Sequence, residues 1–139
     1  MRINIVYWSG TGNTESMAKL IQEGAEEAGA VVTLLEVSGA DASALDADVL
    51  VLGCPSMGSE TLEEGEFEPY IASIEGKLSG KKLALFGSYG WGDGQWMRDW
   101  TERMESAGAV LAAESLIVND APSGASAEQC KAFGKAIAK

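Results

Sequence analysis

The sequence contains no histidine and only two cysteines, Cys54 and Cys130, among its 139 residues. Without histidine, and with so few thiols, a structural zinc site is disfavoured. The two thiols stand in apolar surroundings; they could pair, but we expect both to be reduced in an intracellular chain. No apolar run reaches the roughly 20 residues of a membrane helix, and no secretory leader pattern precedes the first apolar segment. We therefore expect a cytoplasmic protein with no membrane partner.

Positive charge is also scarce. Ten Lys and Arg residues face 21 Asp and Glu residues, for a net charge of −11, which disfavours a nucleic-acid partner. Residues 20–76 contain no Lys or Arg and thirteen acidic residues. Such a surface either serves solubility, or docks basic partners and acts on a bound redox group through its field. Five of its glutamates fall within nine positions: Glu60, Glu63, Glu64, Glu66 and Glu68.

The hydrophobic pattern predicts an α/β protein. Apolar, β-branched runs predict strands at residues 3–7, 31–37, 48–53, 83–87 and 109–118. Apolar residues at helical spacing predict helices from the first loop to Ala28, and at residues 67–78, 96–107 and 127–138, with Gly29 and Gly108 as helix ends. Residues 38–45 form a polar connection with room for one helical turn. Alternation of this kind predicts a doubly wound five-stranded parallel sheet with helices on both faces. The length fits a single domain over residues 1–139.

The loop Ser9-Gly10-Thr11-Gly12-Asn13-Thr14 connects the first strand to the first helix. Its backbone N–H groups, its hydroxyls and the helix N-terminus are the parts of a phosphate site. It lacks the Gly-Lys of a Walker loop, and Glu15 stands where a dinucleotide fingerprint has its third glycine. We infer a terminal monophosphate held by neutral donors; the alternative is a tight turn capped by Thr14.

Two more loops leave the predicted carboxyl ends of strands, where ligands of such sheets bind. In the loop from Gly87 to Gly94, Trp91 stands between two glycines. Its ring either covers a flat ligand or folds back onto the next helix, where Trp96 and Trp100 are expected in the core.

The other loop is Met57-Gly58-Ser59-Glu60. The thioether of Met57 suits a flat ring, or is a plain core contact. Gly58 allows its peptide more than one conformation, or simply makes a turn. Glu60 is an acceptor for a ring N–H, or one more surface charge.

Three segments together resemble the flavodoxins, specifically the short-chain kind found in anaerobic bacteria: Tyr7 to Thr14, Gly53 to Glu60 and Leu85 to Gly94. The likeness runs over nearly the whole chain. It implies strand order 2-1-3-4-5 and FMN at the carboxyl edge. The cofactor-binding residues that it implies are Ser9, Gly10, Thr11, Gly12, Asn13, Thr14, Pro55, Ser56, Met57, Gly58, Ser59, Glu60, Ser88, Tyr89, Gly90, Trp91 and Gly92.

The resemblance also implies roles. The phosphate would be held by Ser9, Thr11, Gly12, Asn13 and Thr14. Trp91 and Met57 would cover the two flavin faces, and Glu60 would accept from the flavin N3–H. Backbone amides near Gly90 and Trp91 would face the O2/N1 edge, and the peptide between residues 58 and 59 would turn its carbonyl toward N5–H on reduction. One departure concerns Pro55: some family members have a serine there that helps to bind the phosphate, and whether Ser56 replaces it is open.

The function that this resemblance implies is that of a low-potential one-electron carrier, not an enzyme. It would cycle mainly between the neutral semiquinone and the anionic hydroquinone of FMN, in place of ferredoxin. Its partners would be redox enzymes with basic docking patches, such as ferredoxin or flavodoxin reductases and ferredoxin-dependent oxidoreductases, and the chain would be a monomer. The alternative is an FMN-dependent NAD(P)H or quinone oxidoreductase on the same fold. A phosphoacceptor domain is disfavoured because Gly53-Cys54 stand where it needs an aspartate.

Overall fold

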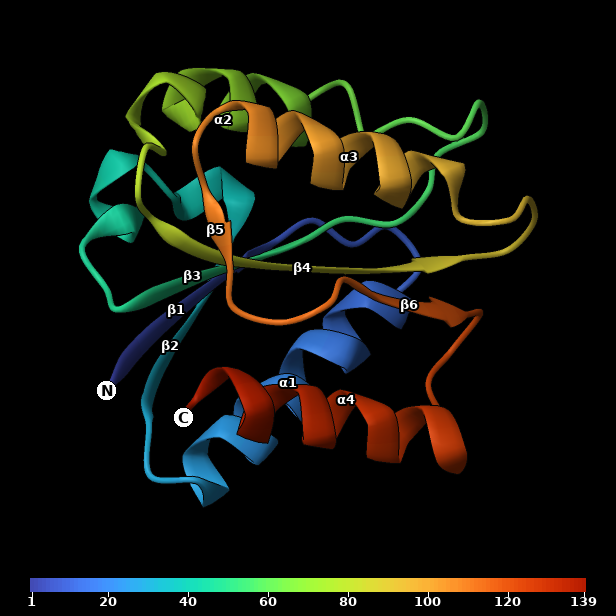
Figure 1. Cartoon of the computed structure of the whole chain (residues 1–139). Coiled ribbons are helices and arrows are strands. Elements are labelled where there is room, and N and C mark those ends of the chain that lie inside the picture. Colours follow the sequence, from blue (N-terminus) through green and yellow to red (C-terminus); the bar gives the residue numbers. More distant parts are fainter.

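The chain forms one parallel β-sheet with helices on both faces (Figure 1). The structure, a computed structural model, describes residues 1–139. Its strands are β1 (Arg2–Tyr7), β2 (Val31–Glu36), β3 (Val49–Gly53), β4 (Lys82–Tyr89), β5 (Val110–Leu111) and β6 (Leu116–Asn119). Its helices are α1 (Asn13–Glu27), α2 (Phe67–Ile74), α3 (Gln95–Ser106) and α4 (Ala125–Ile137). Short 3-10 helices cover Val37–Gly39, Ala42–Leu45 and Glu75–Lys77.

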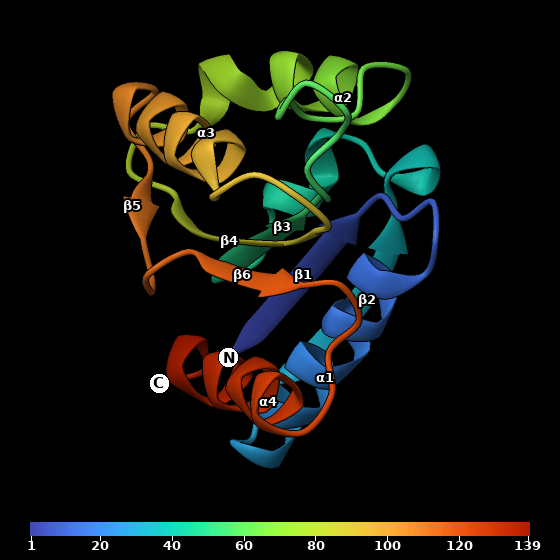
Figure 2. The same ribbon diagram turned by 90° about the vertical axis from the view of Figure 1, so that its right-hand side faces the viewer.

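The sheet has the order β2-β1-β3-β4-β5, which confirms the expected strand order. Every strand pair is parallel, so the loops after β1, β3 and β4 leave the same edge of the sheet. This edge lies at the right of Figure 1, and Figure 2 looks onto it. Strand β3 is buried at every position, as its continuous apolar sequence predicts for a central strand.

The last predicted strand, residues 109–118, differs from the prediction in being divided. Both of its parts, β5 and β6, pair with β4, so the sheet contains six strand segments. Between the two pairings β4 advances from Leu83 to Phe86, whereas its partner advances from Leu111 to Leu116. The partner therefore has two more residues than the ladder can hold, and the connection bulges from the sheet edge.

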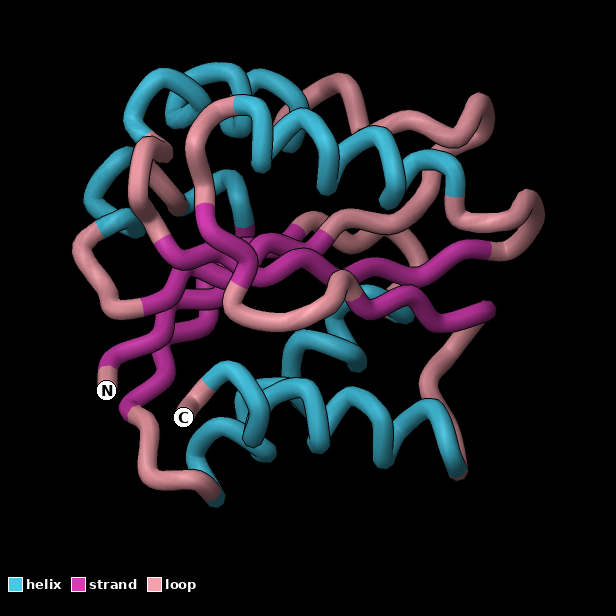
Figure 3. The backbone as a smooth tube through the Cα atoms, viewed as in Figure 1, coloured by secondary structure: helices cyan, strands magenta, loops and turns pink.

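Helices α2 and α3 cover one face of the sheet, and α1 and α4 cover the other; Figure 3 shows the strands as the layer between them. Each face has its own hydrophobic core. Trp96 and Trp100 of α3 are both 2% exposed in the first core, which confirms the prediction that they are core residues.

Two glycines bring α1 and α4 close together on the other face. A β-carbon on Gly24 would overlap the carbonyl group of Lys131, and one on Gly134 would overlap that of Ile21. The absence of side chains at these two positions therefore sets the distance between the helices, and through it the position of α1 beneath the first loop.

The element ends lie close to their predicted places. Gly29 and Gly108 follow α1 and α3 with φ angles of 96° and 95°, the left-handed conformation that ends many helices. Strand β2 ends at Glu36, one residue earlier than predicted, where Val37 begins a 3-10 helix. Helix α4 begins at Ala125, two residues earlier than predicted. The helices of this structure are too short or too polar to cross a bilayer.

Candidate functional site

The loops after β1, β3 and β4 surround one cavity of about 310 Å³ at the carboxyl edge of the sheet. This volume is at the lower end of the range for small-molecule sites, roughly 300–1,000 Å³. The cavity is lined by Trp8, Gly10, Thr11 and Asn13 from the first loop, Pro55, Ser56 and Met57 from the second, Ser88, Tyr89 and Gly90 from the third, and Asp120 after β6. The topology thus brings together residues that are up to about a hundred positions apart in the sequence.

The first loop offers several free backbone donors. The hydroxyl oxygen of Ser9 accepts from the amides of Gly12 and Glu15, at 3.1 and 3.3 Å, and Gly12 adopts the left-handed φ of 97° that starts α1. The backbone N–H groups of Gly10, Thr11, Asn13 and Thr14 donate to no acceptor within the protein. Together with the N-terminus of the fifteen-residue α1, these donors suit a phosphate group.

No cation neutralises this loop. The nearest lysine in the sequence, Lys19, lies 3.8 Å from the carboxylate of Glu15 and is paired with it. Tyr7, at the end of β1, donates its hydroxyl to Glu15 at 3.1 Å. Burial, this hydrogen bond, and the charges of Glu15 and Glu36 raise the pKa of Tyr7 to about 12, so it stays protonated. An anion bound here would rely on neutral donors, as the sequence predicted for this loop.

Thr14 faces the sheet. Its hydroxyl oxygen lies 3.0 Å from that of Ser88, and the two residues are 1% and 4% exposed. The pair joins the start of α1 to the end of β4. Thr14 was predicted to offer its hydroxyl as a donor, but this hydroxyl is used by Ser88 and Thr14 does not line the cavity, whereas Ser88 does. Thr14 offers its backbone N–H to the loop instead.

The second loop forms a tight turn at its tip. The amide of Glu60 donates to the carbonyl of Met57 at 2.8 Å, and that of Met57 to Thr61 at 3.0 Å. Gly58 and Ser59 are exposed, and a β-carbon on Gly58 would meet nothing within 4 Å. The peptide between them has room to rotate.

Pro55 and Ser56 both line the cavity. Pro55 has no N–H group, and the amide of Ser56 is used by a 3.0 Å bond to the carbonyl of Ser88. The hydroxyl of Ser56 has no partner in the protein. If Ser56 replaces the serine that some relatives have at position 55, it can do so only through this hydroxyl.

Glu60 carries a buried acceptor that nothing in the protein satisfies. Its backbone has a left-handed φ of 53°, and its Oε1 is buried without a hydrogen-bond partner. A β-carbon on Gly92 would overlap this oxygen, so the carboxylate lies against the backbone of the third loop. Leaving such an acceptor unpaired costs about 1–3 kcal/mol or more. Glu60 does not line the cavity described above, so a ligand N–H group reaches this oxygen only when the contact between Glu60 and Gly92 opens.

Trp91 is 61% exposed, and so its ring is not folded back onto α3. The neighbour that does pack there is Tyr89, whose ring centre lies 5.7 Å from that of Trp96. Trp96 in turn donates its indole N–H to the carbonyl of Cys54 at 3.3 Å. The third loop therefore leaves one large aromatic face open, which fits a flat ligand.

The five glutamates of residues 60–68 do not act as one free acidic cluster. Glu63 accepts from the amides of Gly65, Glu66 and Phe67 at 2.7, 2.8 and 2.9 Å, and so caps the start of α2. Partial burial opposes ionisation of Glu63, but these three bonds outweigh it and lower its pKa.

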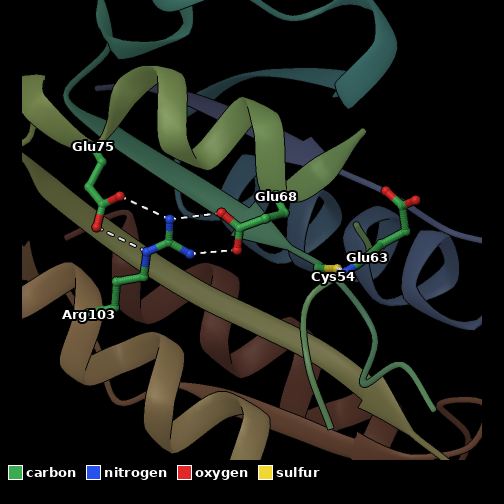
Figure 4. A network of polar contacts seen from close by, with 5 residues as sticks. All are labelled: Cys54, Glu63, Glu68, Glu75 and Arg103. Carbon is green, nitrogen blue, oxygen red and sulfur yellow. Dashed lines mark hydrogen bonds and ion pairs between the residues drawn. The ribbon is translucent and has the colours of Figure 1, made fainter. Parts of the chain in front are cut away.

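Glu68 is paired with an arginine that it shares with Glu75. Arg103 on α3 donates two bonds to Glu68, at 2.7 and 2.9 Å, and two to Glu75, at 3.0 and 2.9 Å (Figure 4). In the same view, the sulfur of Cys54 lies at the amide of Glu63. Burial raises the pKa of Cys54 to about 12, so the thiol stays protonated. Of the five glutamates, only Glu64 and Glu66 are fully exposed.

Two lining residues were not predicted from the sequence, Trp8 and Asp120. The Trp8 ring packs against the loop backbone, 2.9 Å from where a β-carbon of Gly10 would lie. Asp120 follows β6 with a left-handed φ of 59°, and its amide donates to the carbonyl of Tyr89 at 2.8 Å. The rule that ligands lie beyond the carboxyl ends of parallel strands would have found Asp120, because it follows the last strand.

Comparisons with known proteins agree with this geometry. A family model described as Flavodoxin matches residues 5–134. The chain is 55% identical over 137 residues to a flavodoxin of Clostridium beijerinckii, covering 98% of this chain and 99% of that protein. It is 46% identical over 138 residues to a flavodoxin of Megasphaera elsdenii, with 99% and 98% coverage. A solution structure of two-electron reduced Megasphaera elsdenii flavodoxin superposes with a TM-score of 0.89 at 44% identity, covering 98% of each chain.

Proposed function

The chain belongs to the flavodoxin family, and we propose that it is a low-potential one-electron carrier that alternates mainly between the neutral semiquinone and the anionic hydroquinone of bound FMN. Flavodoxins bind FMN and transfer electrons between redox partners, so the protein is an electron-transfer flavoprotein and not an enzyme. FMN supplies the electron-accepting ring, and the protein supplies binding, orientation and electrostatics.

The observation that carries the assignment of the site is the unpartnered Oε1 of Glu60. In the proposed complex this oxygen accepts the N3–H of the ring. The open face of Trp91 would cover one side of the ring and Met57 the other, and backbone amides near Gly90 and Trp91 would face its O2/N1 edge. Both the buried acceptor and the exposed indole are costly without a ligand, and one flat ring with an N–H edge satisfies the two together.

The phosphate end would be held by the first loop. The free amides of Gly10, Thr11, Asn13 and Thr14 and the hydroxyls of Thr11 and Ser56 are its proposed donors. Gly12 shapes the loop instead of contacting the phosphate through its amide, because that amide donates to the Ser9 hydroxyl oxygen and Gly12 supplies the left-handed turn. The amide of Ser9 donates to no acceptor within the protein and is a further proposed donor.

Low potential follows from the charge around the ring. No cation neutralises a phosphate in the first loop, and the carboxylate of Glu60 lies beside the third loop. Each disfavours a second negative charge on the cofactor. The first electron is favoured in a different way. The peptide between Gly58 and Ser59 is exposed and has room to rotate, so its carbonyl could turn to accept a hydrogen bond from an N5–H group.

The proposed partners are redox enzymes with basic docking patches, including reductases and oxidoreductases that also use ferredoxin. The net charge of −11 and the exposed carboxylates of Glu64 and Glu66 support this choice. We further propose that residues 1–139 form a single domain that works as a monomer in the cytoplasm.

Stepwise reduction of the purified, FMN-loaded protein under argon tests the proposal. Absorption spectra should pass through a blue neutral semiquinone that accumulates before the hydroquinone forms. A direct two-electron conversion without that species would contradict the one-electron role. Mixing the oxidised protein with NADPH is the control, and the yellow colour should persist because the protein is not a nicotinamide oxidoreductase.

A further inference from the structure

A hollow larger than the cofactor cavity lies outside the cofactor site. It is a groove of about 460 Å³ between α3 and the connection from β5 to β6, called here the α3 groove. Helix α3 and β5 stand together at one side of the molecule in Figure 2. The apolar part of its lining comes from Met97, Leu111 and Ile117. Glu114 and Ser115, in the connection that divides the last strand, also line the groove.

The α3 groove carries negative charge that the protein does not neutralise. Glu102, Glu105 and Glu114 line it, all three are exposed, and none takes part in an ion pair. Its one cation, Arg98, is already paired, with Nη2 at 3.0 Å from Asp93. An apolar floor edged by free carboxylates is complementary to an apolar side chain flanked by cations.

The α3 groove is continuous with the third cofactor loop. Gly94 lines the groove and ends the loop that carries Trp91. Arg98 also donates to the carbonyl of Asp93 at 3.0 Å and to the side chain of Gln95 at 2.8 Å. A segment seated in the groove therefore contacts the side chain that holds the base of this loop.

We propose that the α3 groove docks a segment of a redox partner in which leucine-like side chains are flanked by Lys or Arg. This inference rests on the proposed function for the identity of the partner, because a basic electron-transfer enzyme is what brings such a segment to the cofactor edge. The groove adds an apolar anchor to the general attraction between opposite charges, and so fixes where the partner sits.

The test uses the FMN-loaded protein and a capped six-residue peptide with two central leucines flanked by two arginines on each side. Calorimetry gives its affinity, and amide chemical shifts locate it. We expect shifts at Thr101, Ser115 and Ile117. The triple variant Glu102→Gln, Glu105→Gln and Glu114→Gln should bind the peptide about tenfold more weakly.

A matched control variant removes the same charge elsewhere. Glu26→Gln, Asp46→Asn and Glu128→Gln alter exposed carboxylates that form no ion pair and lie away from the groove. It should bind the peptide within about twofold of the wild type. Equal weakening in the two variants would overturn the proposal, as would equal binding of a peptide with serines in place of the leucines. Absence of the blue intermediate on reduction would contradict the proposed function instead, and peptide binding is measured on the oxidised, FMN-loaded protein without any reduction step.

Discussion

The carboxylate of Glu60 lies against the backbone of Gly92, so closely that a β-carbon on Gly92 would overlap Oε1 of Glu60. Both residues have left-handed backbones, with φ angles of 53° and 85°. The contact joins the second loop to the third and holds an unpaired acceptor at their meeting point.

Gly92→Ala should weaken FMN binding. A left-handed alanine costs about 1–2 kcal/mol, and its methyl group must also displace Glu60, so the affinity should fall about tenfold or more. Quenching of flavin fluorescence on titration with apoprotein measures it. The control is Gly39→Ala, where a β-carbon meets nothing within 4 Å and φ is not left-handed. Unchanged affinity in Gly92→Ala would show that the loops rearrange freely.

Glu60→Gln keeps the shape of the side chain and removes its charge. A hydrogen bond to a charged acceptor is worth about 1 kcal/mol more than one to a neutral acceptor, so FMN should bind about fivefold more weakly. Loss of the charge should also make the second reduction potential less negative. Glu64→Gln, an exposed change in the same loop, should have little effect on either quantity. If both variants behave alike, Glu60 acts as a surface charge only.

Asp120→Asn should raise the second reduction potential while leaving the first nearly unchanged. A carboxylate about 10 Å from a new negative charge contributes ~0.4–0.8 kcal/mol at a dielectric constant of about 40–80, which is about 20–35 mV for one electron. Potentiometric titration at low ionic strength resolves such a change, and added salt should reduce it. Asp46→Asn removes an exposed carboxylate at the opposite edge of the sheet and serves as the control.

Gly134→Ala should destabilise the fold. Alanine is favoured over glycine within a helix by about 0.5–1 kcal/mol. Its methyl group, however, would overlap the carbonyl of Ile21, and this backbone group of α1 cannot move aside as a flexible side chain could. Overpacking of this kind costs about 1–3 kcal/mol, so we expect a net loss in urea unfolding experiments. Gly76→Ala, in a 3-10 helix with open space around it, should be neutral or slightly stabilising. A stabilised Gly134→Ala protein would show that α1 and α4 can move apart.

The ion pair between Arg103 and Glu75 should stabilise the protein only above acidic pH. The hydrogen bond from Arg103 lowers the pKa of Glu75 below its ordinary value of 4.5. A carboxyl group with a lowered pKa contributes stability that is complete above its unfolded pKa and is lost as the pH falls through its folded pKa. Glu75→Gln should therefore cost about 0.5–1 kcal/mol in urea unfolding at pH 7 and progressively less below pH 4.5. Glu26→Gln, exposed and unpaired, should show no such dependence, and a cost independent of pH in Glu75→Gln would contradict the assignment.

Much of the fold could be predicted because it depends on local patterns. The continuous apolar run before Gly53 indicated a buried central strand, and the helical spacing of Trp96 and Trp100 indicated core residues; both are confirmed. The division of the last strand could not be predicted. It arises because the chain there has two residues more than β4 has partners for, and no local pattern reports a difference in register between two strands.

The features of the site likewise fall into those that could be predicted from the sequence and those that could not. The glycines and hydroxyls of the first loop predicted a phosphate site. They did not predict that the Ser9 hydroxyl would accept a hydrogen bond from the Gly12 amide, or that the Thr14 hydroxyl would bond to Ser88. The sequence of the glutamate-rich loop predicted a concentration of negative charge. It did not predict that Arg103, 35 residues further along the chain than Glu68, would form an ion pair with Glu68.

By itself, the sequence determined which chemical groups stand at the ends of the strands, because periodicity and turn residues act over a few neighbouring positions. The tertiary structure decided which of these groups remain free to meet a ligand. Of the five clustered glutamates, Glu63 is used by a helix cap, Glu68 by an arginine, and Glu60 is left with a buried oxygen and no donor. That outcome depends on where α2, α3 and the backbone of Gly92 come to lie. Such contacts join distant parts of the chain, and they form only when the helices have packed onto the two faces of the sheet.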